Sequence, residues 1–222
     1  MERTQNLKPI RPARSFYERE TNTVRVIVIF HLVGFIGLYF LPTKPYFIHL
    51  VPVHLWLMML LVLINHDEPG KKFLAFTGIV FLTGWLVEYC GVYTGALFGN
   101  YTYGHTLGIS VFKIPVLMGV TWFLLVYTTG VSMRKLNIKP MILRIFGGAV
   151  LLVILDFLIE PIAQRLDYWH WDGNEAPPQN YICWFIISAA LLVVFELFKF
   201  KKQSMVGPSI LICQFIFFAA LQ

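Results

Sequence analysis

Seven apolar stretches follow one another along the chain, and short polar segments separate them. They occupy residues 24–40, 46–64, 73–92, 114–132, 142–160, 181–198 and 205–221. An α-helix needs roughly 20 apolar residues to cross the ~30 Å hydrocarbon core of a bilayer, and most of these stretches approach that length. The pattern therefore predicts an all-α fold, a polytopic transmembrane helix bundle of about seven helices that forms a single domain over residues 24–222.

Residues 1–23 precede this domain as a polar segment. They carry both charge signs and two prolines. The apolar stretch that follows lacks a small-residue cleavage site, so we interpret the segment as a retained cytoplasmic tail rather than a signal peptide.

Composition agrees with a membrane protein. Hydrophobic residues make up 57% of the chain and charged residues 14%, a balance outside that of ordinary soluble domains. The formal net charge of +6 would suit a nucleic-acid partner only if the basic residues gathered on one solvated face. They fall between the apolar stretches instead, so we exclude nucleic acid and expect membrane lipid as the surroundings.

Lysine and arginine are distributed unevenly between the two sides of the predicted bundle. With seven helices, one side holds only Lys44, Lys113 and Arg165, and the other side holds all the remaining basic residues. Cytoplasmic segments retain positive charge in membrane proteins. The asymmetry therefore predicts a cytoplasmic N-terminus and a C-terminus on the opposite side.

Four carboxylates lie within the apolar stretches, where ionisable side chains are costly and commonly functional. They are Glu88, Asp156, Glu160 and Glu196. Glu196 lies one turn from Lys199, which predicts an interfacial ion pair. The other three carboxylates converge near the non-cytoplasmic ends of their predicted helices, so they are the candidates for chemistry.

Asp156 and Glu160 share one helix face, because a spacing of four residues rotates a helix by about 400°. Two carboxyl groups that close do not both ionise readily in a low dielectric, so one of them should keep its proton at neutral pH. A proton donor beside an acceptor suits general acid/base catalysis, and we predict Glu88, Asp156 and Glu160 as catalytic. The structural alternative stays open: the pair would bind Arg165 or Lys113, and Glu88 would brace a neighbouring helix.

Aromatic side chains are dense around these acids, including Phe98 and Trp184, and many lie in the two long connections on the side with few basic residues. A single ring is an ordinary interface anchor, but a cluster beside buried acids would stabilise a carbocation formed when an alkene is protonated. The predicted substrate-binding residues are His54, Tyr89, Tyr101, Tyr103, Trp122, Trp169, Trp171 and Asn180.

Histidine and cysteine patterns indicate no metal site. His49 and His54 are five residues apart and point to different sides of a helix, His31 is isolated in the sequence, and no HxxxH or HExxH pattern occurs. The three cysteines form no CxxC pair. Glycine-rich nucleotide-binding motifs are also absent, so we expect no cofactor.

Three separated motifs resemble those of one protein family. They are EYCGVYTGALFGNYTY over residues 88–103, DFLIEP over residues 156–161 and YWHW over residues 168–171. In this order the motifs look like those of the membrane-bound carotenoid biosynthesis proteins, whose characterised members are carotenoid 1′,2′-hydratases of the CruF type. The resemblance covers most of residues 73–198, and the tail and the last apolar stretch add little to it.

The resemblance implies that water is added across the terminal C1=C2 double bond of an acyclic (ψ) carotenoid end group, such as those of lycopene or γ-carotene. It implies a multi-pass protein of the bacterial inner membrane with a hydrophobic carotenoid substrate, and it admits contacts with other enzymes of that pathway. Protonation at C2 and capture of water at C1 would use the acids predicted above.

Three other functions compete with hydration. A carotenoid cyclase or isomerase begins with the same protonation but ends with loss of a proton. A proton-coupled transporter would use intramembrane carboxylates as relays, although no inverted repeat is apparent. A retinal photoreceptor is excluded, because residues 205–221 contain no lysine that would form a Schiff base.

Overall fold

The computed structural model describes residues 13–201 and 203–222 of the chain. Within these ranges, eight helices and two small antiparallel sheets are present. The helices are α1 (Ala13–Tyr39), α2 (Lys44–Ile48), α3 (Val51–Asn65), α4 (Lys71–Thr94), α5 (Leu117–Lys135), α6 (Met141–Arg165), α7 (Pro178–Leu197) and α8 (Val206–Ala220). The strands are β1 (Tyr101–Tyr103), β2 (Ser110–Val111), β3 (Ile114–Pro115) and β4 (Trp169–Trp171).

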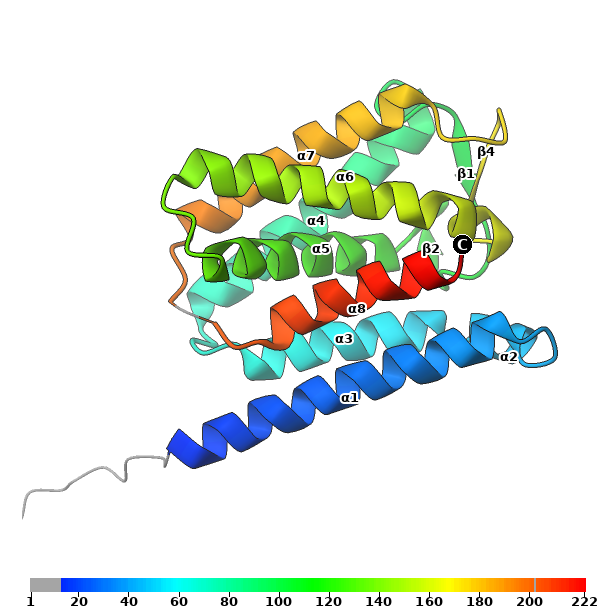
Figure 1. Ribbon diagram of the computed structural model, residues 1–222. Helices are drawn as coiled ribbons and strands as arrows, with labels where there is room; N and C mark the ends of the chain where they lie inside the picture. The colour runs from blue at the N-terminus through cyan, green and yellow to red at the C-terminus, as the bar shows by residue number, and fades with distance from the viewer. Residues whose placement is uncertain (1–12, 202) are drawn as a thin grey trace, which may run out of the picture.

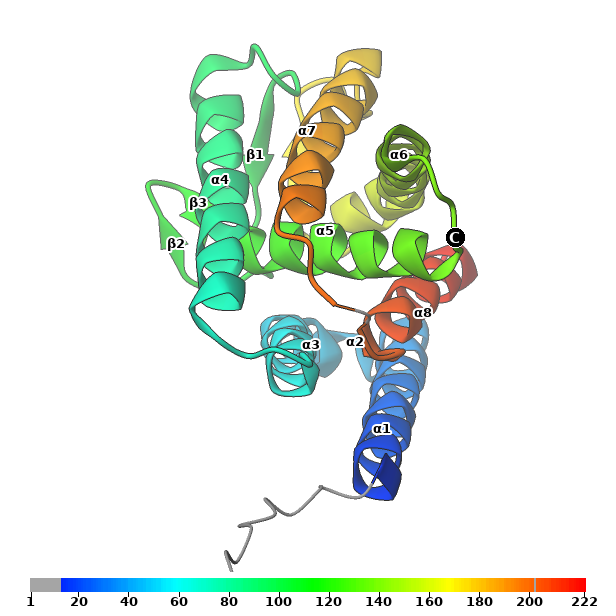
Figure 2. The same ribbon diagram turned by 90° about the vertical axis from the view of Figure 1, so that its left-hand side faces the viewer.

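Helix α5 lies at the centre of the bundle (Figures 1 and 2). It packs against α3, α4, α6, α7 and α8, and most of its side chains are buried, Trp122 and Phe123 completely so. Helix α1 packs against α3 and α8 at the edge of the bundle. Side chains on α5 are therefore placed to meet partners from several other helices.

The bundle has two chemically different ends. One end, which we call the ribbon end after the paired strands β1 and β4, holds the strands, the C-terminal ends of α4 and α6 and the N-terminal ends of α5 and α7. The lysine-rich end holds the opposite ends of these four helices, with Lys71, Lys135 and Lys199 among its residues. The distribution of basic residues predicts that the lysine-rich end is cytoplasmic.

Four helices in the described residues are long and apolar enough to cross a membrane. They are α4, α6, α7 and the part of α1 from Glu18 to Tyr39, whereas α3 and α8 are apolar but shorter. A helical fold of the membrane type is therefore confirmed. The number of crossings and their direction stay predictions.

The single helix expected over residues 46–64 is wrong, because two helices occupy this region. Helix α2 ends at Ile48, and α3 begins at Val51. Pro52 has no N–H to donate to the carbonyl of Ile48, four residues earlier, so a continuous helix would lose a hydrogen bond at this point. This break raises the number of helices above seven.

Several other helix boundaries differ from the expected ones. Helix α1 begins at Ala13, within the segment expected as a polar tail. The helix expected over residues 114–132 begins at Leu117, because Ile114–Pro115 pairs with β2 as a strand. Helix α6 runs past its expected end, through Pro161 to Arg165. The missing N–H of Pro161 removes one backbone hydrogen bond, but the helix continues through this residue and packs closely against α7.

Strands β1 and β4 form a two-stranded antiparallel ribbon. Tyr101 lies opposite Trp171 in the register, and Tyr103 lies opposite Trp169. Both strands belong to connections in which the apolar periodicity predicts no regular structure, so their pairing depends on contacts between segments distant in sequence. The ribbon joins the loop after α4 to the loop after α6 (Figure 1).

Glu196 is buried at the lysine-rich end between two arginines. Arg134 and Arg144 each place a guanidinium nitrogen near Oε2, at 3.0 and 2.9 Å. Each also donates a second hydrogen bond to Oε1, at 3.3 and 2.9 Å. The expected ion pair with Lys199 is therefore wrong, because the forked guanidinium groups from α5 and α6 match both carboxylate oxygens.

Candidate active site

The ribbon presents four polar aromatic side chains toward the helices. Because side chains alternate between the two faces of a strand, Tyr101, Tyr103, Trp169 and Trp171 share one face, and the intervening Thr102 is exposed. The rings of Tyr101 and Trp171 lie 5.1 Å apart. Two hydroxyl donors and two indole donors are thereby gathered on the side of the ribbon that faces the bundle.

Glu88, in α4, is buried and accepts three hydrogen bonds. The hydroxyls of Tyr101 and Tyr103 donate to Oε2, each at 2.7 Å, and the indole N–H of Trp122 in α5 donates to Oε1 at 2.8 Å. Burial and, secondarily, the nearby Glu88 raise the pKa of Tyr101 well above its ordinary value. The Tyr101 hydroxyl therefore stays protonated and remains a donor to the carboxylate.

Glu160, in α6, is held by the other strand of the ribbon. The indole N–H groups of Trp169 and Trp171 donate to Oε2 at 3.1 and 2.7 Å. The amide of Asn180, in α7, donates to Oε1 of Glu160 at 3.3 Å and to Oδ2 of Asp156 at 2.8 Å. One amide thus links the two carboxyl groups that the sequence places a turn apart.

Asp156 is completely buried, and one of its oxygens has no hydrogen-bond partner among residues 13–201 and 203–222. Oδ1 receives no hydrogen bond, whereas Oδ2 accepts the bond from Asn180. An ionised carboxylate oxygen without a donor is costly in apolar surroundings. The neutral, protonated carboxyl group suits this position better than the charged one.

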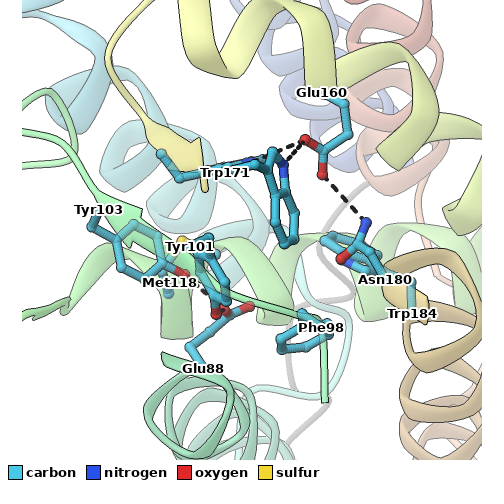
Figure 3. Close-up of a pocket in the computed structure, with 10 residues that line it drawn as sticks. Glu88, Phe98, Tyr101, Tyr103, Met118, Glu160, Trp171, Asn180 and Trp184 are labelled. Atoms are coloured by element: carbon cyan, nitrogen blue, oxygen red, sulfur yellow. Dashed lines mark hydrogen bonds between the residues drawn. The ribbon is translucent and has the colours of Figure 1, made fainter. Parts of the chain in front are cut away.

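A cavity of about 20 Å³ lies between Glu88 and Glu160. Figure 3 shows the two carboxyl groups on opposite sides, with the rings of Tyr101 and Trp171 between them. The other lining residues are Phe98, Tyr103, Met118, Trp169, Asn180 and Trp184. A space of this size accommodates about one water molecule. Asp156 is not part of the lining, so the two members of the acidic pair have different access to the cavity.

All three acids receive hydrogen bonds from neutral donors. Within the described residues, no basic side chain bonds to Glu88, Asp156 or Glu160. The alternative in which Arg165 or Lys113 ties down the acidic pair is not found, because the Arg165 guanidinium donates to backbone carbonyls at the end of α8. Glu88 does brace a neighbouring helix, since its bond from α5 joins α4 to that helix.

Two predicted substrate-binding residues lie away from the cavity. Tyr89 faces another side of α4, where its ring lies 4.6 Å from that of Tyr93. His54, in α3, contacts His31 of α1, with ring centroids 4.7 Å apart. His31 is therefore not isolated, and the geometry brings neither Tyr89 nor His54 to the acids.

Met118 lines the cavity but was not among the residues predicted from the sequence. Met118 lies in the first turn of α5, four residues before Trp122, and this helical spacing is the signal that would have identified it. No group of three or more His, Cys, Asp or Glu side chains that could hold a metal ion is found in residues 13–201 and 203–222.

The cavity lies within a region that matches a known family. A family model described as "Carotenoid biosynthesis protein" matches residues 47–221, which is more than half of the chain and includes every lining residue. Neither a curated protein nor a solved structure matches the chain. The extent of the family match shows that the chain belongs to the carotenoid biosynthesis protein family.

Proposed function

We propose that the protein is a carotenoid hydratase that adds water to the terminal C1=C2 double bond of an acyclic (ψ) end group. The observation that carries this proposal is the pair of carboxyl groups, Glu88 and Glu160, that face one water-sized, aromatic-lined cavity. Acid-catalysed hydration needs a proton donor, surroundings that tolerate a cation, and an acceptor for a proton of the attacking water. The cavity has a candidate for each role.

Glu160 is the proposed proton donor. Asn180 joins it to Asp156, and two carboxyl groups this close are expected to share one proton in a low dielectric. Glu160 is the member of the pair that lines the cavity, so it delivers the proton to C2. Asp156 acts behind it as a positioning residue that holds the shared proton between turnovers.

Glu88 is the proposed proton acceptor on the opposite side of the cavity. Burial opposes a negative charge on Glu88, and its three hydrogen bonds from phenol and indole groups partly offset this cost in the ionised form. The negative faces of Tyr101 and Trp171 stabilise the cation at C1 until water adds there and Glu88 takes its proton. A C–H and a C–O bond form, the C=C π bond and an O–H bond break, and the proton then returns from Glu88 to the acidic pair. Water is the only co-reactant, so no redox cofactor is needed.

The cavity must enlarge before a substrate can bind. A ψ end group is several times larger than a single water molecule, so a space of about 20 Å³ does not admit it. Met118 lines the cavity and has the most flexible apolar side chain among the lining residues. We therefore expect Met118 to move first when the hydrocarbon enters from the lipid.

Two rival functions fit these observations less well. A cyclase or isomerase would share the proton donor. Neither reaction adds water, so neither needs a water-sized space beside a carboxylate. A proton-coupled transporter would need carboxylates that relay protons across the bundle, but Glu196 at the lysine-rich end is bound by Arg134 and Arg144. The proposed hydration, by contrast, needs only the acids at the ribbon end.

The test is expression of the full chain in cells that make lycopene or γ-carotene, followed by chromatography and mass spectrometry of the pigments. We expect a more polar product that is heavier than the substrate by one water. A cyclic or rearranged product of unchanged mass would replace the hydratase proposal with the cyclase or isomerase. If no ψ-ended carotenoid is converted while the protein is present in the membrane, the proposal is refuted.

A further inference from the structure

A second and larger cavity lies at the lysine-rich end, away from the acids. It has a volume of about 810 Å³ and runs between α5, α6 and α8, which lie side by side in Figure 1. We name it the α5–α8 groove; its apolar lining includes Met133, Leu151, Phe195, Leu211 and Ile212. A volume of this size is typical of ligand sites rather than of packing defects.

The groove extends from the charged surface into the apolar part of the bundle. Lys135 ends α5 at the surface, whereas Leu151 lies ten residues beyond Met141, the first residue of α6. Ten residues of α-helix measure about 15 Å, which is about half of the ~30 Å hydrocarbon core. The groove therefore has the reach of an acyl chain in one leaflet of the membrane.

The rim of the groove is cationic. Arg134, Lys135 and Lys201 belong to its lining, and none of the lining residues is Asp or Glu. Arg134 is engaged by Glu196, whereas Lys201 contacts Glu68 at 2.7 Å in an exposed pair. Exposed ion pairs contribute little to stability, so Lys201 can turn to another anion, and Lys135 adds a second charge.

We propose that the α5–α8 groove binds an anionic phospholipid of the leaflet at the lysine-rich end. One acyl chain lies against Leu151 and Ile212, and the phosphate lies beside Lys135 and Lys201. A zwitterionic lipid fills the same space but is attracted less strongly by the lysines of the rim, because its net charge is zero. A carotenoid hydrocarbon fills the apolar part but offers no phosphate to the two lysines.

The test is native mass spectrometry of the full chain in detergent, titrated with dioleoyl-phosphatidylglycerol or with dioleoyl-phosphatidylcholine. We expect the anionic lipid to bind more tightly, by about fivefold for each lysine that meets the phosphate. Lys135→Gln should reduce this preference by about fivefold. Ile212→Trp, at a position that is 55% exposed, should fill the groove and remove the tight site for both lipids.

Two matched variants serve as controls, because they change the same residue types outside the groove. Lys71→Gln removes a lysine at the start of α4, and Ile216→Trp enlarges a side chain one turn along α8; neither position lines the groove. Both should bind the anionic lipid as the unmodified chain does. Equal binding of the two lipids, an unchanged preference in Lys135→Gln, or displacement of the phospholipid by lycopene would overturn the proposal.

Discussion

Buried carboxylates occur at both ends of the bundle, but their surroundings differ. At the lysine-rich end, Glu196 is bound by two guanidinium groups that occupy both of its oxygens. At the ribbon end, Glu88 and Glu160 receive hydrogen bonds from phenol, indole and amide groups, all of them neutral. The same residue type is therefore neutralised by ion pairing in one place and left without a counter-charge in the other.

This difference separates a structural role from a chemical one. A carboxylate between two arginines is held in its ionised form, and removing one partner of a buried ion pair is strongly destabilising. A carboxyl group held by neutral donors keeps its geometry whether it carries a proton or not, so it can give and accept one during a reaction. Substitutions of the acids at the ribbon end should therefore lower activity, whereas substitution of Glu196 should lower stability.

The largest expected effect is on product formation in Glu160→Gln. The amide still accepts hydrogen bonds from the two tryptophans but has no proton to deliver to the substrate, so conversion of a ψ-ended carotenoid should fall at least about 100-fold. Pigment analysis of membranes with equal amounts of protein measures this loss. Activity that persists in the variant would remove Glu160 from the acid role.

Glu196→Gln should lower stability while activity per folded molecule is retained. The substitution leaves Arg134 and Arg144 without their shared anion, and we expect a loss of about 3 kcal/mol in unfolding free energy. Unfolding in detergent followed by fluorescence measures the change. Loss of conversion in a normally stable Glu196→Gln protein would mean that the two ends are not functionally distinct.

Acidification should weaken the lysine-rich end through His66, which is 2% exposed and follows α3. Burial lowers the pKa of His66 from 6.5 to about 4. Below pH 6.5 the unfolded chain therefore binds a proton that the folded chain does not bind until about pH 4. The free energy of unfolding should therefore decline by up to about 3 kcal/mol as the pH falls from 6.5 to about 4, and then level off.

The matched variant for this measurement is His66→Gln, which removes the titrating ring. Its unfolding free energy should depend less on pH between 6.5 and 4 than that of the unmodified chain. The pH profile of product formation, which we assign to the ribbon end, should keep its shape in this variant. An unchanged pH dependence of stability would show that His66 is not the responsible group.

The smallest expected effect is that of Trp171→Phe, which removes the 2.7 Å donor to Glu160 and keeps an aromatic ring. Loss of a hydrogen bond to a charged or partly charged group should lower the rate by about tenfold. Trp85→Phe is the control, because the buried indole nitrogen of Trp85 has no hydrogen-bond partner in the part of the chain that the structure describes. Equal rates for both variants would mean that the indole hydrogen bond to Glu160 does not affect proton transfer.

The helical fold was predictable from local features of the chain. Apolar stretches of membrane-spanning length fall on α1, α4, α6 and α7, because the preference of each residue for lipid depends little on distant contacts. The breaks were harder to place: the helix ends near Pro52 and Ile114 depend on a missing donor and on strand pairing. The adjacency of Asp156 and Glu160 also followed from helical spacing alone.

By itself, the sequence determined the membrane-type helices, the acids inside them and the helical spacing that joins Asp156 to Glu160. Only the tertiary structure decided which donors each acid meets. Tyr101 and Trp171 come together through the register of two three-residue strands, and Arg134 reaches Glu196 because α5 packs against α7. Such partners lie far apart in the chain, and their meeting depends on long-range pairing and packing that no local pattern encodes.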